Sequence, residues 1–392
     1  MTDFSEDRPV PPAVVSRHPR FAVLDFARLM AVFMMIQGHT VGTYVIPAEI
    51  PQDGFFGMIY QWLRGLTSPT FLLISGMVNF VGIRRDERGR VLPRILRKRI
   101  RRALLLILVD YMLIFPGNRV WDLFVLPADR WFAFFRVGTL NIIGVSLLML
   151  VGVMALSRSD RAFIASATIV GTLIAAATPW VHRVDWFAFL PPFFAHYLTY
   201  KGGSFFSIFP HSGFLFIGAA IGSYALALLR ENDTWKFAQR IGELGIVVTI
   251  LALTAGVYGR HLLPPHDFYI SSPFLFCEKV GLSLILIGAY SVVFNLTRRF
   301  ERFYSELSRK TLHIYTAHVL VVFGNTWIWS FSRVWRNAFT FENGLLLAAV
   351  FIVLSFGVGI LLTYAERGRV VLNRSLRFGF TVFLSYVLLF GI

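Results

Sequence analysis

Three ionisable side chains lie in one apolar stretch near the start of the chain. This stretch, FAVLDFARLMAVFMMIQGHTVGTYVI, contains Asp25, Arg28 and His39. Arg28 and His39 are eleven residues apart, which in an α-helix puts them within about 20° of each other on one face and roughly 16 Å apart along the axis. Asp25 comes three residues before Arg28, so the two can pair. Because charges inside a membrane are costly, such residues mark a functional site by default.

This helix face would carry an ion pair near one end and an imidazole near the other, which suits a long molecule with a polar head. Histidine transfers protons well near neutral pH, so His39 is the candidate of this face for acid–base chemistry. A purely structural interpretation stays open, in which Asp25 and Arg28 orient the helix at the interface and His39 caps its outer end.

The composition of the whole chain indicates a membrane protein. Of the 392 residues, 56% are hydrophobic and only 15% are charged, whereas about 25% are charged in soluble proteins. Cys277 is the only cysteine, which excludes a disulfide framework within the chain. A net charge of +16 would point to nucleic acid in a soluble protein. Here the excess of Lys and Arg in cytoplasmic loops explains the charge, so we expect no nucleic-acid partner.

Stretches of about 20 apolar residues are long enough to cross a membrane as a helix. We therefore predict an all-α, polytopic integral membrane helix bundle of about 10–11 transmembrane helices. The last stretch is short and could cross only partly, so the lower number is the alternative. The candidate spans are 21–47, 56–82, 103–117, 138–156, 163–179, 205–229, 242–258, 273–296, 311–332, 343–364 and 379–392.

Positive charge alternates between the loops that join these spans. The N-terminal tail and every second loop carry 27 Lys and Arg, and the opposite loops carry 8. Since the basic loops of membrane proteins are cytoplasmic, we predict a cytoplasmic N-terminus and a multi-pass protein of the bacterial inner membrane, in contact with membrane lipid. Residues 1–20 lack the apolar core of a signal peptide and are expected to form a flexible cytoplasmic tail. Residues 21–392 then form a single transmembrane domain.

The sequence LDFARLMAV resembles the Leu-Asp-x-x-Arg-Gly-x-Ala opening of a large superfamily of transmembrane acyltransferases. That superfamily includes the family-three membrane acyltransferases and the heparan-glucosaminide N-acetyltransferase-like proteins. Arg28 and His39 match the former family's motif of an Arg and a His separated by ten residues. Leu29 replaces the usual Gly, which is a mild departure.

Three later segments resemble the same superfamily in the same order, so the resemblance covers residues 20–324. The segment LTSPTFLLISGMVNF, which includes Ser75, is similar to the second span of these proteins. FPHSGFLFIGAAIGSY resembles a segment of the heparan-acetyltransferase-like branch, with His211 where that branch often has Trp. KTLHIYTAHVLVV resembles a late span, with Tyr315 and His318 in place.

The resemblance implies an O- or N-acyltransferase that moves an acyl group, usually acetyl, from cytoplasmic acetyl-CoA or another acyl-CoA to a glycan or related acceptor across the membrane. The phosphates of CoA would bind Arg, which holds phosphate through a bidentate fork. Segment 84–102 carries ten Lys and Arg, although such a segment can also be only a topology determinant or contact anionic lipid. The residues assigned to donor binding are Arg28, Asp25, Arg97, Lys98 and Arg101.

The acceptor must lose a proton when it attacks the thioester, and under this resemblance we predict that His39 is the general base. A transient acyl-histidine is the alternative, since histidine is also a nucleophile.

Hydrogen-bond donors are also needed for the oxyanion that forms in this attack. The candidates for this role, or for lining the same tunnel, are Ser75, Asn79, His211, Tyr315 and His318. Other charged residues in the apolar stretches are expected to form ordinary pairs between helices. These are Arg64, Asp110, Glu278 and Lys279.

Two loops on the predicted outer side, 179–204 and 259–272, are rich in aromatic residues and His. Such side chains suit sugar rings and hydroxyl groups, so the expected acceptor is a saccharide or a cell-envelope glycan. They suit a membrane interface equally well. The loop histidines have no compact metal-ligand spacing, and we expect no metal. A second copy of the chain could be a further partner.

Two rival functions stay open from the sequence. A secondary transporter of a small polar or glycan-related solute would also carry mid-membrane charges and broken helices, but the two halves of the chain show no correspondence. A non-catalytic membrane subunit that keeps the fold is the other rival. Turnover of labelled acetyl-CoA by the purified protein would separate the enzyme from both.

Overall fold

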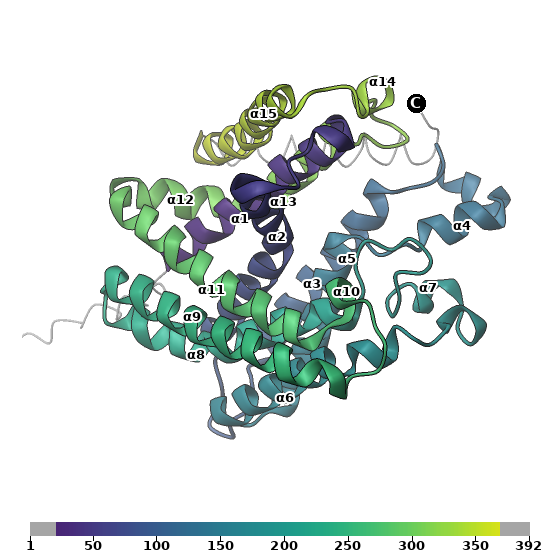
Figure 1. Cartoon of the computed structure of the whole chain (residues 1–392). Coiled ribbons are helices and arrows are strands. Elements are labelled where there is room, and N and C mark those ends of the chain that lie inside the picture. Colours follow the sequence, from purple (N-terminus) through teal and green to yellow (C-terminus); the bar gives the residue numbers. More distant parts are fainter. Residues whose placement is uncertain (1–20, 369–392) are drawn as a thin grey trace, which may run out of the picture.

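The computed structural model describes residues 21–368 and is built from α-helices joined by turns and short 3-10 segments (Figure 1). The α-helices are α1 (Ala22–Tyr44), α2 (Gly54–Val81), α3 (Pro93–Leu113), α4 (Ala128–Phe134), α5 (Thr139–Leu156), α6 (Asp160–Val181), α7 (Pro192–Ala195), α8 (Ile208–Arg230), α9 (Thr234–Gly259), α10 (Phe268–Ser271), α11 (Pro273–Leu296), α12 (Glu301–Leu307), α13 (Thr311–Val322), α14 (Ser332–Trp335) and α15 (Phe341–Gly368). Seven of them are long and apolar enough to cross a membrane, namely α1, α5, α6, α8, α9, α11 and α15. The chain is therefore an all-α, multi-pass membrane protein.

Two other predicted spans coincide with helices that carry charge. Residues 56–82 form α2, which is long but contains Arg64. Residues 103–117 belong mostly to α3, whose first half holds the basic cluster and is therefore strongly polar. Both helices belong to the bundle, but neither has the uniformly apolar composition of a lipid-facing span.

The predicted span at 311–332 is shorter than expected. Its helix, α13, has twelve residues, which rise about 18 Å, whereas the hydrocarbon core of a bilayer is about 30 Å thick. The chain turns at Gly324, where φ is +67°, a conformation that glycine adopts without strain. The predicted span at 379–392 and the predicted tail at 1–20 lie outside the described residues.

Helices α2 and α8 pack with their backbones in close contact. A Cβ atom added at Gly76 of α2 would collide with the carbonyl oxygen of Leu215, and one added at Gly218 of α8 would collide with that of Leu73. Small residues allow this approach in membranes, where close packing between helices replaces the hydrophobic driving force of water. Gly76, which follows Ser75 in the segment that resembles the family's second span, is therefore a packing glycine.

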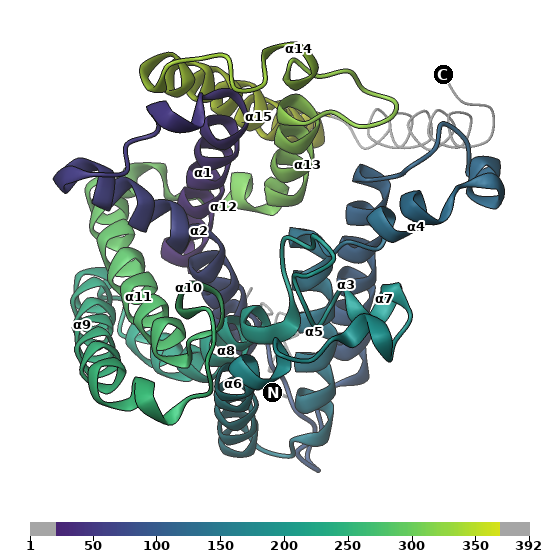
Figure 2. The same cartoon turned by 45° about the vertical axis from the view of Figure 1, so that its right-hand side comes forward.

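Helices α1 and α2 lie between two groups of helices in both views. Helices α9 and α11 are on one side of them, and α3 and α5 are on the other (Figures 1 and 2). Helix α1 contacts α2, α11, α13 and α15, while α5 packs against α3 and α8. The helix that carries Arg28 and His39 is thus surrounded by other helices, and this burial positions its polar face inside the protein.

The predicted outer loop 179–204 is anchored to the rest of the protein by His196, which is fully buried. Its Nε2 lies 3.0 Å from the carbonyl oxygen of Phe132, and its Nδ1 lies 2.9 Å from the hydroxyl of Ser204. Burial, together with the charge of Arg136, lowers the pKa of His196. A neutral ring fits this arrangement, because Nε2–H donates to the carbonyl while Nδ1 accepts from the hydroxyl. His196 is therefore a structural residue of this loop.

Candidate active site

His39 of α1 and His318 of α13 lie side by side. Their rings are stacked, with centroids 5.3 Å apart, and Nδ1 of His39 lies 3.1 Å from Nε2 of His318. At this distance one nitrogen donates a hydrogen bond and the other accepts it, so the two rings share one proton along this line. Both residues were predicted from the sequence, but their pairing across 279 positions was not.

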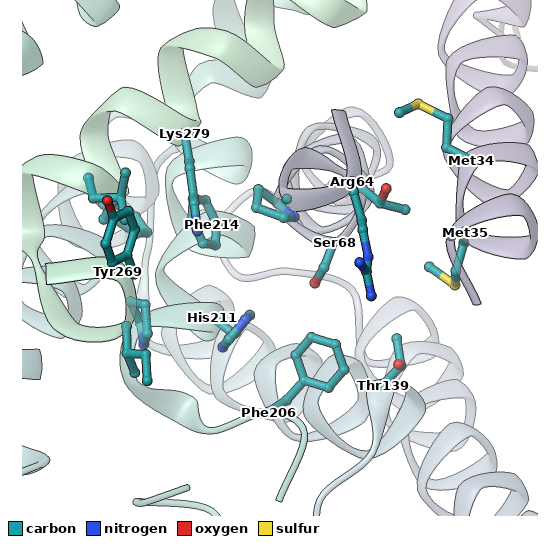
Figure 3. A pocket seen from close by; sticks show the side chains of 18 of the residues that line it. Met34, Met35, Arg64, Ser68, Thr139, Phe206, His211, Phe214, Tyr269 and Lys279 are labelled. Carbon is teal, nitrogen blue, oxygen red and sulfur yellow. The ribbon is translucent and has the colours of Figure 1, made fainter. Parts of the chain in front are cut away.

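His39 lines a pocket of about 500 Å³, which we call the histidine pocket. Figure 3 shows side chains from several helices, with Tyr269 of α10 and Phe206 of the segment before α8 among them, around this pocket. Arg64, His211 and Lys279 come from α2, α8 and α11, respectively. Its lining residues are Met34, Met35, Gly38, His39, Arg64, Gly65, Thr67, Ser68, Pro69, Thr139, Tyr200, Phe206, Pro210, His211, Phe214, Tyr269, Ile270, Ser272, Leu275, Phe276 and Lys279.

A second pocket, of about 680 Å³, lies between α1, α2, α3, α5 and α13, and we call it the basic pocket. Six cationic side chains line it, while the described residues contribute no Asp or Glu to its wall. The cations are Arg28, Arg84, Arg94, Lys98, Arg99 and Arg102. The other lining residues are Met35, Phe71, Ser75, Val78, Asn79, Gly82, Ile95, Leu106, Thr139, Leu140, Ile143, Leu147, Thr311, Leu312 and Tyr315.

The two pockets adjoin at Met35 and Thr139, which line both of them. Helix α1 contributes Arg28 to the basic pocket and His39 to the histidine pocket. The predicted face of this helix therefore connects the two cavities, with the ion-pair end in one and the imidazole in the other. Arg28 pairs with Asp25 at 3.3 Å, as predicted, and both side chains are largely buried.

Tyr315 lies between the basic pocket and His318. It lines this pocket and packs edge-on against His318 with ring centroids 4.9 Å apart. His318 itself is fully buried and lines neither pocket. Its place is behind His39, where it can orient the ring but cannot meet a ligand directly.

The predicted donor-binding residues of α3 divide between two faces of the helix. Lys98 lines the basic pocket, whereas Arg97 and Arg101 are exposed and do not line it. Residues four apart in a helix share a face, and Arg94, Lys98 and Arg102 form such a row. The sequence signal that identifies this row is the spacing of four residues between its three cations within segment 84–102.

The remaining predicted tunnel residues also separate into two groups. Ser75 and Asn79 line the basic pocket, and the amide of Asn79 donates to the backbone oxygen of Ser75 one turn earlier at 2.8 Å. His211 lines the histidine pocket, where its Nδ1 lies 3.0 Å from the hydroxyl of Tyr200. The structure thus distributes the candidates along the combined cavity and does not gather them into one cluster.

The expected pairing of the four other intramembrane charges is wrong within the described residues. Asp110 caps the start of α5 instead, where its carboxylate accepts a hydrogen bond from the backbone N–H of Asn141 at 3.0 Å. Arg64 and Lys279 form no ion pair with any described residue and line the histidine pocket. Glu278 is partly exposed beside Lys279 and has no other described partner. The sequence contained these residues but did not indicate which cavity they enter.

The geometry of the combined cavity suits a group transfer between two bound molecules. One pocket offers positive charge for a polyanion, the other offers an imidazole for proton transfer, and the two meet beside the helix that supplies both. Two molecules bound in these pockets would therefore lie next to each other at the shared wall.

The model of one known family matches the chain over residues 20–272, and its description is heparan-alpha-glucosaminide N-acetyltransferase, catalytic. The matched part contains Arg28, His39 and the basic row of α3, and it ends before Lys279 and His318. A comparison with curated proteins finds no significant match.

Proposed function

Because the chain belongs to the heparan-alpha-glucosaminide N-acetyltransferase family and is a membrane acetyltransferase, we propose that it transfers acetyl from acetyl-CoA in the basic pocket to a saccharide-like acceptor in the histidine pocket. The observation that carries this proposal is that the two pockets adjoin at Met35 and Thr139. Donor and acceptor can then meet without either molecule crossing the bundle. The rival transporter loses its support, because family membership specifies group transfer.

The basic pocket fits the donor at both of its ends. CoA carries several phosphates, and Arg94, Lys98 and Arg102 lie in one row along α3. The rest of the wall includes Leu140, Ile143 and other apolar residues, which suit the uncharged pantetheine arm. A charged row beside an apolar wall orients the donor with its thioester toward the junction.

The acceptor's proton is taken by His39 in this proposal. Donation by Nδ1–H of His39 to Nε2 of His318 leaves Nε2 of His39 with a free lone pair. The acceptor oxygen or nitrogen forms a bond to the carbonyl carbon while its proton moves to this nitrogen. The carbon–sulfur bond then breaks, and sulfur leaves with the bonding pair and takes the proton from the imidazolium. CoA departs as the thiol, and His39 returns to its neutral form.

We place the basic pocket on the cytoplasmic side, where acetyl-CoA is made. The support is the concentration of Lys and Arg in 84–102 and the tendency of basic loops to stay in the cytoplasm. Replacing Arg90 by Cys in a Cys277→Ser background gives a single reporter thiol. A membrane-impermeant thiol reagent should label it in inside-out vesicles and not in intact cells, and the reverse pattern would exclude this orientation.

The central test uses purified protein with acetyl-labelled CoA and an envelope glycan extract. Wild type should transfer label, while Lys98→Gln should raise the donor KM roughly tenfold through loss of one charged contact. Arg97→Gln is the matched control, because it removes a neighbouring cation of the same helix that does not line the pocket. Equal effects of the two substitutions would remove the basic pocket as the donor site.

A further inference from the structure

The junction of the two pockets is formed by two side chains of different character. Among the described residues, Met35 of α1 and Thr139 of α5 are the two that line both pockets. Figure 3 shows them on the same side of the histidine pocket, across from Tyr269. Met35 offers an apolar thioether chain, and Thr139 offers a hydroxyl. A group that is transferred from one pocket to the other must therefore pass beside these two side chains.

Met35 lies between Arg28 and His39 on the same face of α1. It follows Arg28 by seven residues and precedes His39 by four, which places it within about 20° of the first and about 40° of the second around the helix. Along the helix axis it is roughly 10 Å from Arg28 and roughly 6 Å from His39. This face therefore presents a cation, an apolar side chain and an imidazole, in that order, to the combined cavity.

The side chain of Met35 has little room to move away from the junction. It is only 5% exposed and belongs to the main hydrophobic core, together with Leu140 and Tyr315 of the basic pocket. Its neighbours on α1, Val32 and Ile36, are fully buried. Methionine is flexible in open space, but protein interiors are close-packed, so an extra group at this point must displace core atoms.

The shape of a thioester determines which part of the donor meets this wall. Its carbonyl carbon carries sulfur, oxygen and the acyl chain in one plane. In the proposed reaction, sulfur belongs to the CoA in the basic pocket, and the acceptor attacks from the histidine pocket, where His39 takes its proton. The oxygen and the acyl chain then face the walls of the junction. The hydroxyl of Thr139 suits the oxygen, and the side chain of Met35 suits the alkyl group.

We propose that Met35 sets the length of the acyl chain that the enzyme transfers, so that acetyl is accepted and longer chains are excluded. This inference rests on the proposed function, because it concerns the acyl group of a donor bound in the basic pocket. The acetyl group ends in one methyl, which contacts the thioether chain of Met35. A butyryl group extends further in the same direction and collides with a buried side chain that the core holds in place.

The test is a competition between acetyl-CoA and butyryl-CoA for the purified full-length protein, with the envelope glycan extract as acceptor. Mass spectrometry of the acylated glycans gives the ratio of the two kcat/KM values directly. Wild type should favour acetyl by roughly tenfold or more, since one methylene changes the fit to a hydrophobic wall by about 10–200-fold. Met35→Ala removes the thioether end of the side chain and should shift the ratio toward butyryl by roughly tenfold or more.

Met34→Ala is the matched control for this substitution. Met34 is the adjacent methionine of α1 and lines the histidine pocket but not the basic pocket, so its loss should leave the ratio of acyl groups near that of wild type. Met35→Leu keeps a similar side-chain volume and should keep the preference for acetyl. Met35→Val is a milder truncation, which should shift the ratio in the same direction as Met35→Ala. Equilibrium dialysis with labelled CoA confirms that each variant is folded.

Three results would overturn the inference: equal use of acetyl-CoA and butyryl-CoA by wild type, an unchanged ratio in both Met35→Ala and Met35→Val, or an equal shift in Met34→Ala. Failure of the proposed function looks different. It would appear as no transfer from either acyl-CoA, or as full activity of His39→Gln. Even then, butyryl-CoA should bind to Met35→Ala roughly tenfold more tightly than to wild type, and equal binding would exclude Met35 as the limit on chain length.

Discussion

The basic pocket and the histidine pocket share two wall residues but are assembled in different ways. Most cations of the basic pocket come from one helix and its preceding loop, within residues 84–102. The cationic and imidazole side chains of the histidine pocket come from α1, α2, α8 and α11, so residues from 39 to 279 meet there. A donor that is the same in many enzymes can be held by one local segment, whereas a pocket built from several elements can vary its acceptor by changing any one of them.

The largest effect that separates the two pockets is expected from His39→Gln. Gln can form a hydrogen bond but cannot take up the acceptor's proton, so transfer should fall by about 10²–10⁴-fold. Acetyl-CoA affinity should stay near that of wild type, since the imidazole lines the histidine pocket and not the basic one. Single-turnover acetyl transfer and equilibrium dialysis with labelled acetyl-CoA measure the two quantities. Near-normal turnover in this variant would leave His39 only a structural role.

A smaller loss is expected from His318→Ala, which removes the partner of His39 without touching either pocket wall. Partners that orient metal-bound imidazoles are typically worth about 10–100-fold, and we expect a loss of similar size here. The loss should fall on kcat, with the KM of acetyl-CoA unchanged. His318→Gln should restore part of the rate, because its side-chain oxygen can accept from Nδ1–H of His39. If Gln restores nothing, His318 serves packing alone.

The sequence identified the separate residues of this pair but not the pair itself. Helix geometry converts the spacing of Arg28 and His39 into a shared helix face. In the structure each of the two lines one of the adjoining pockets. The contact between His39 and His318 joins helices far apart in the chain, so no local period contains it. The same limit explains Arg64 and Lys279, which the sequence showed as costly intramembrane charges but could not assign to a common cavity.

The hydropathy of the sequence also did not predict the two cavities. Apolar length correctly indicated a multi-pass helical protein, because the absence of water forces backbone hydrogen bonding within helices. It did not show that α13 ends after twelve residues. That helix is short because the turn at Gly324 ends it, and inside a bundle a short helix is tolerated where its neighbours cover its ends.

Helix α2 lines both pockets and packs closely on α8, so a substitution at this contact should affect both pockets together. Gly76→Ala would bring a Cβ atom against backbone atoms of Leu215 and Ala219, which cannot rotate away as a side chain can. We expect a loss of stability of about 1–3 kcal/mol, measured as a lower temperature of thermal unfolding in detergent.

Gly152→Ala is the control for this substitution. A Cβ atom at Gly152 of α5 would meet nothing within 4 Å, so the helix gains the better propensity of alanine without a clash. Its unfolding temperature should equal or exceed that of wild type. Equal destabilisation by the two substitutions would show that the close packing of α2 on α8 is not what the glycine provides.

The smallest expected effect is a pH-dependent loss of stability in the loop that lines the histidine pocket, with no effect on the basic pocket. His196 anchors the loop that supplies Tyr200 and Phe206 to the histidine pocket and contributes nothing to the basic pocket. Because burial lowers the pKa of His196 in the folded protein, the unfolded chain binds a proton below about pH 6.5 that the folded loop does not. The stability of the anchored loop is therefore complete above that pH and declines below it, by at most about 1.4 kcal/mol per pH unit.

Acidification should accordingly weaken acceptor binding before it weakens donor binding. The measurement is hydrogen exchange of residues 196–207 between about pH 7.5 and pH 5.5, on either side of the ordinary histidine pKa, corrected for the intrinsic pH dependence of exchange, together with the KM of each substrate. His196→Gln is the comparison, because it removes the titrating group while an amide can still hydrogen-bond to Phe132 and Ser204. Loop protection that falls equally in wild type and in this variant would mean that some other group titrates. If protection falls in wild type alone while donor KM stays constant, the acid-sensitive element belongs to the histidine pocket and the two cavities are energetically separable.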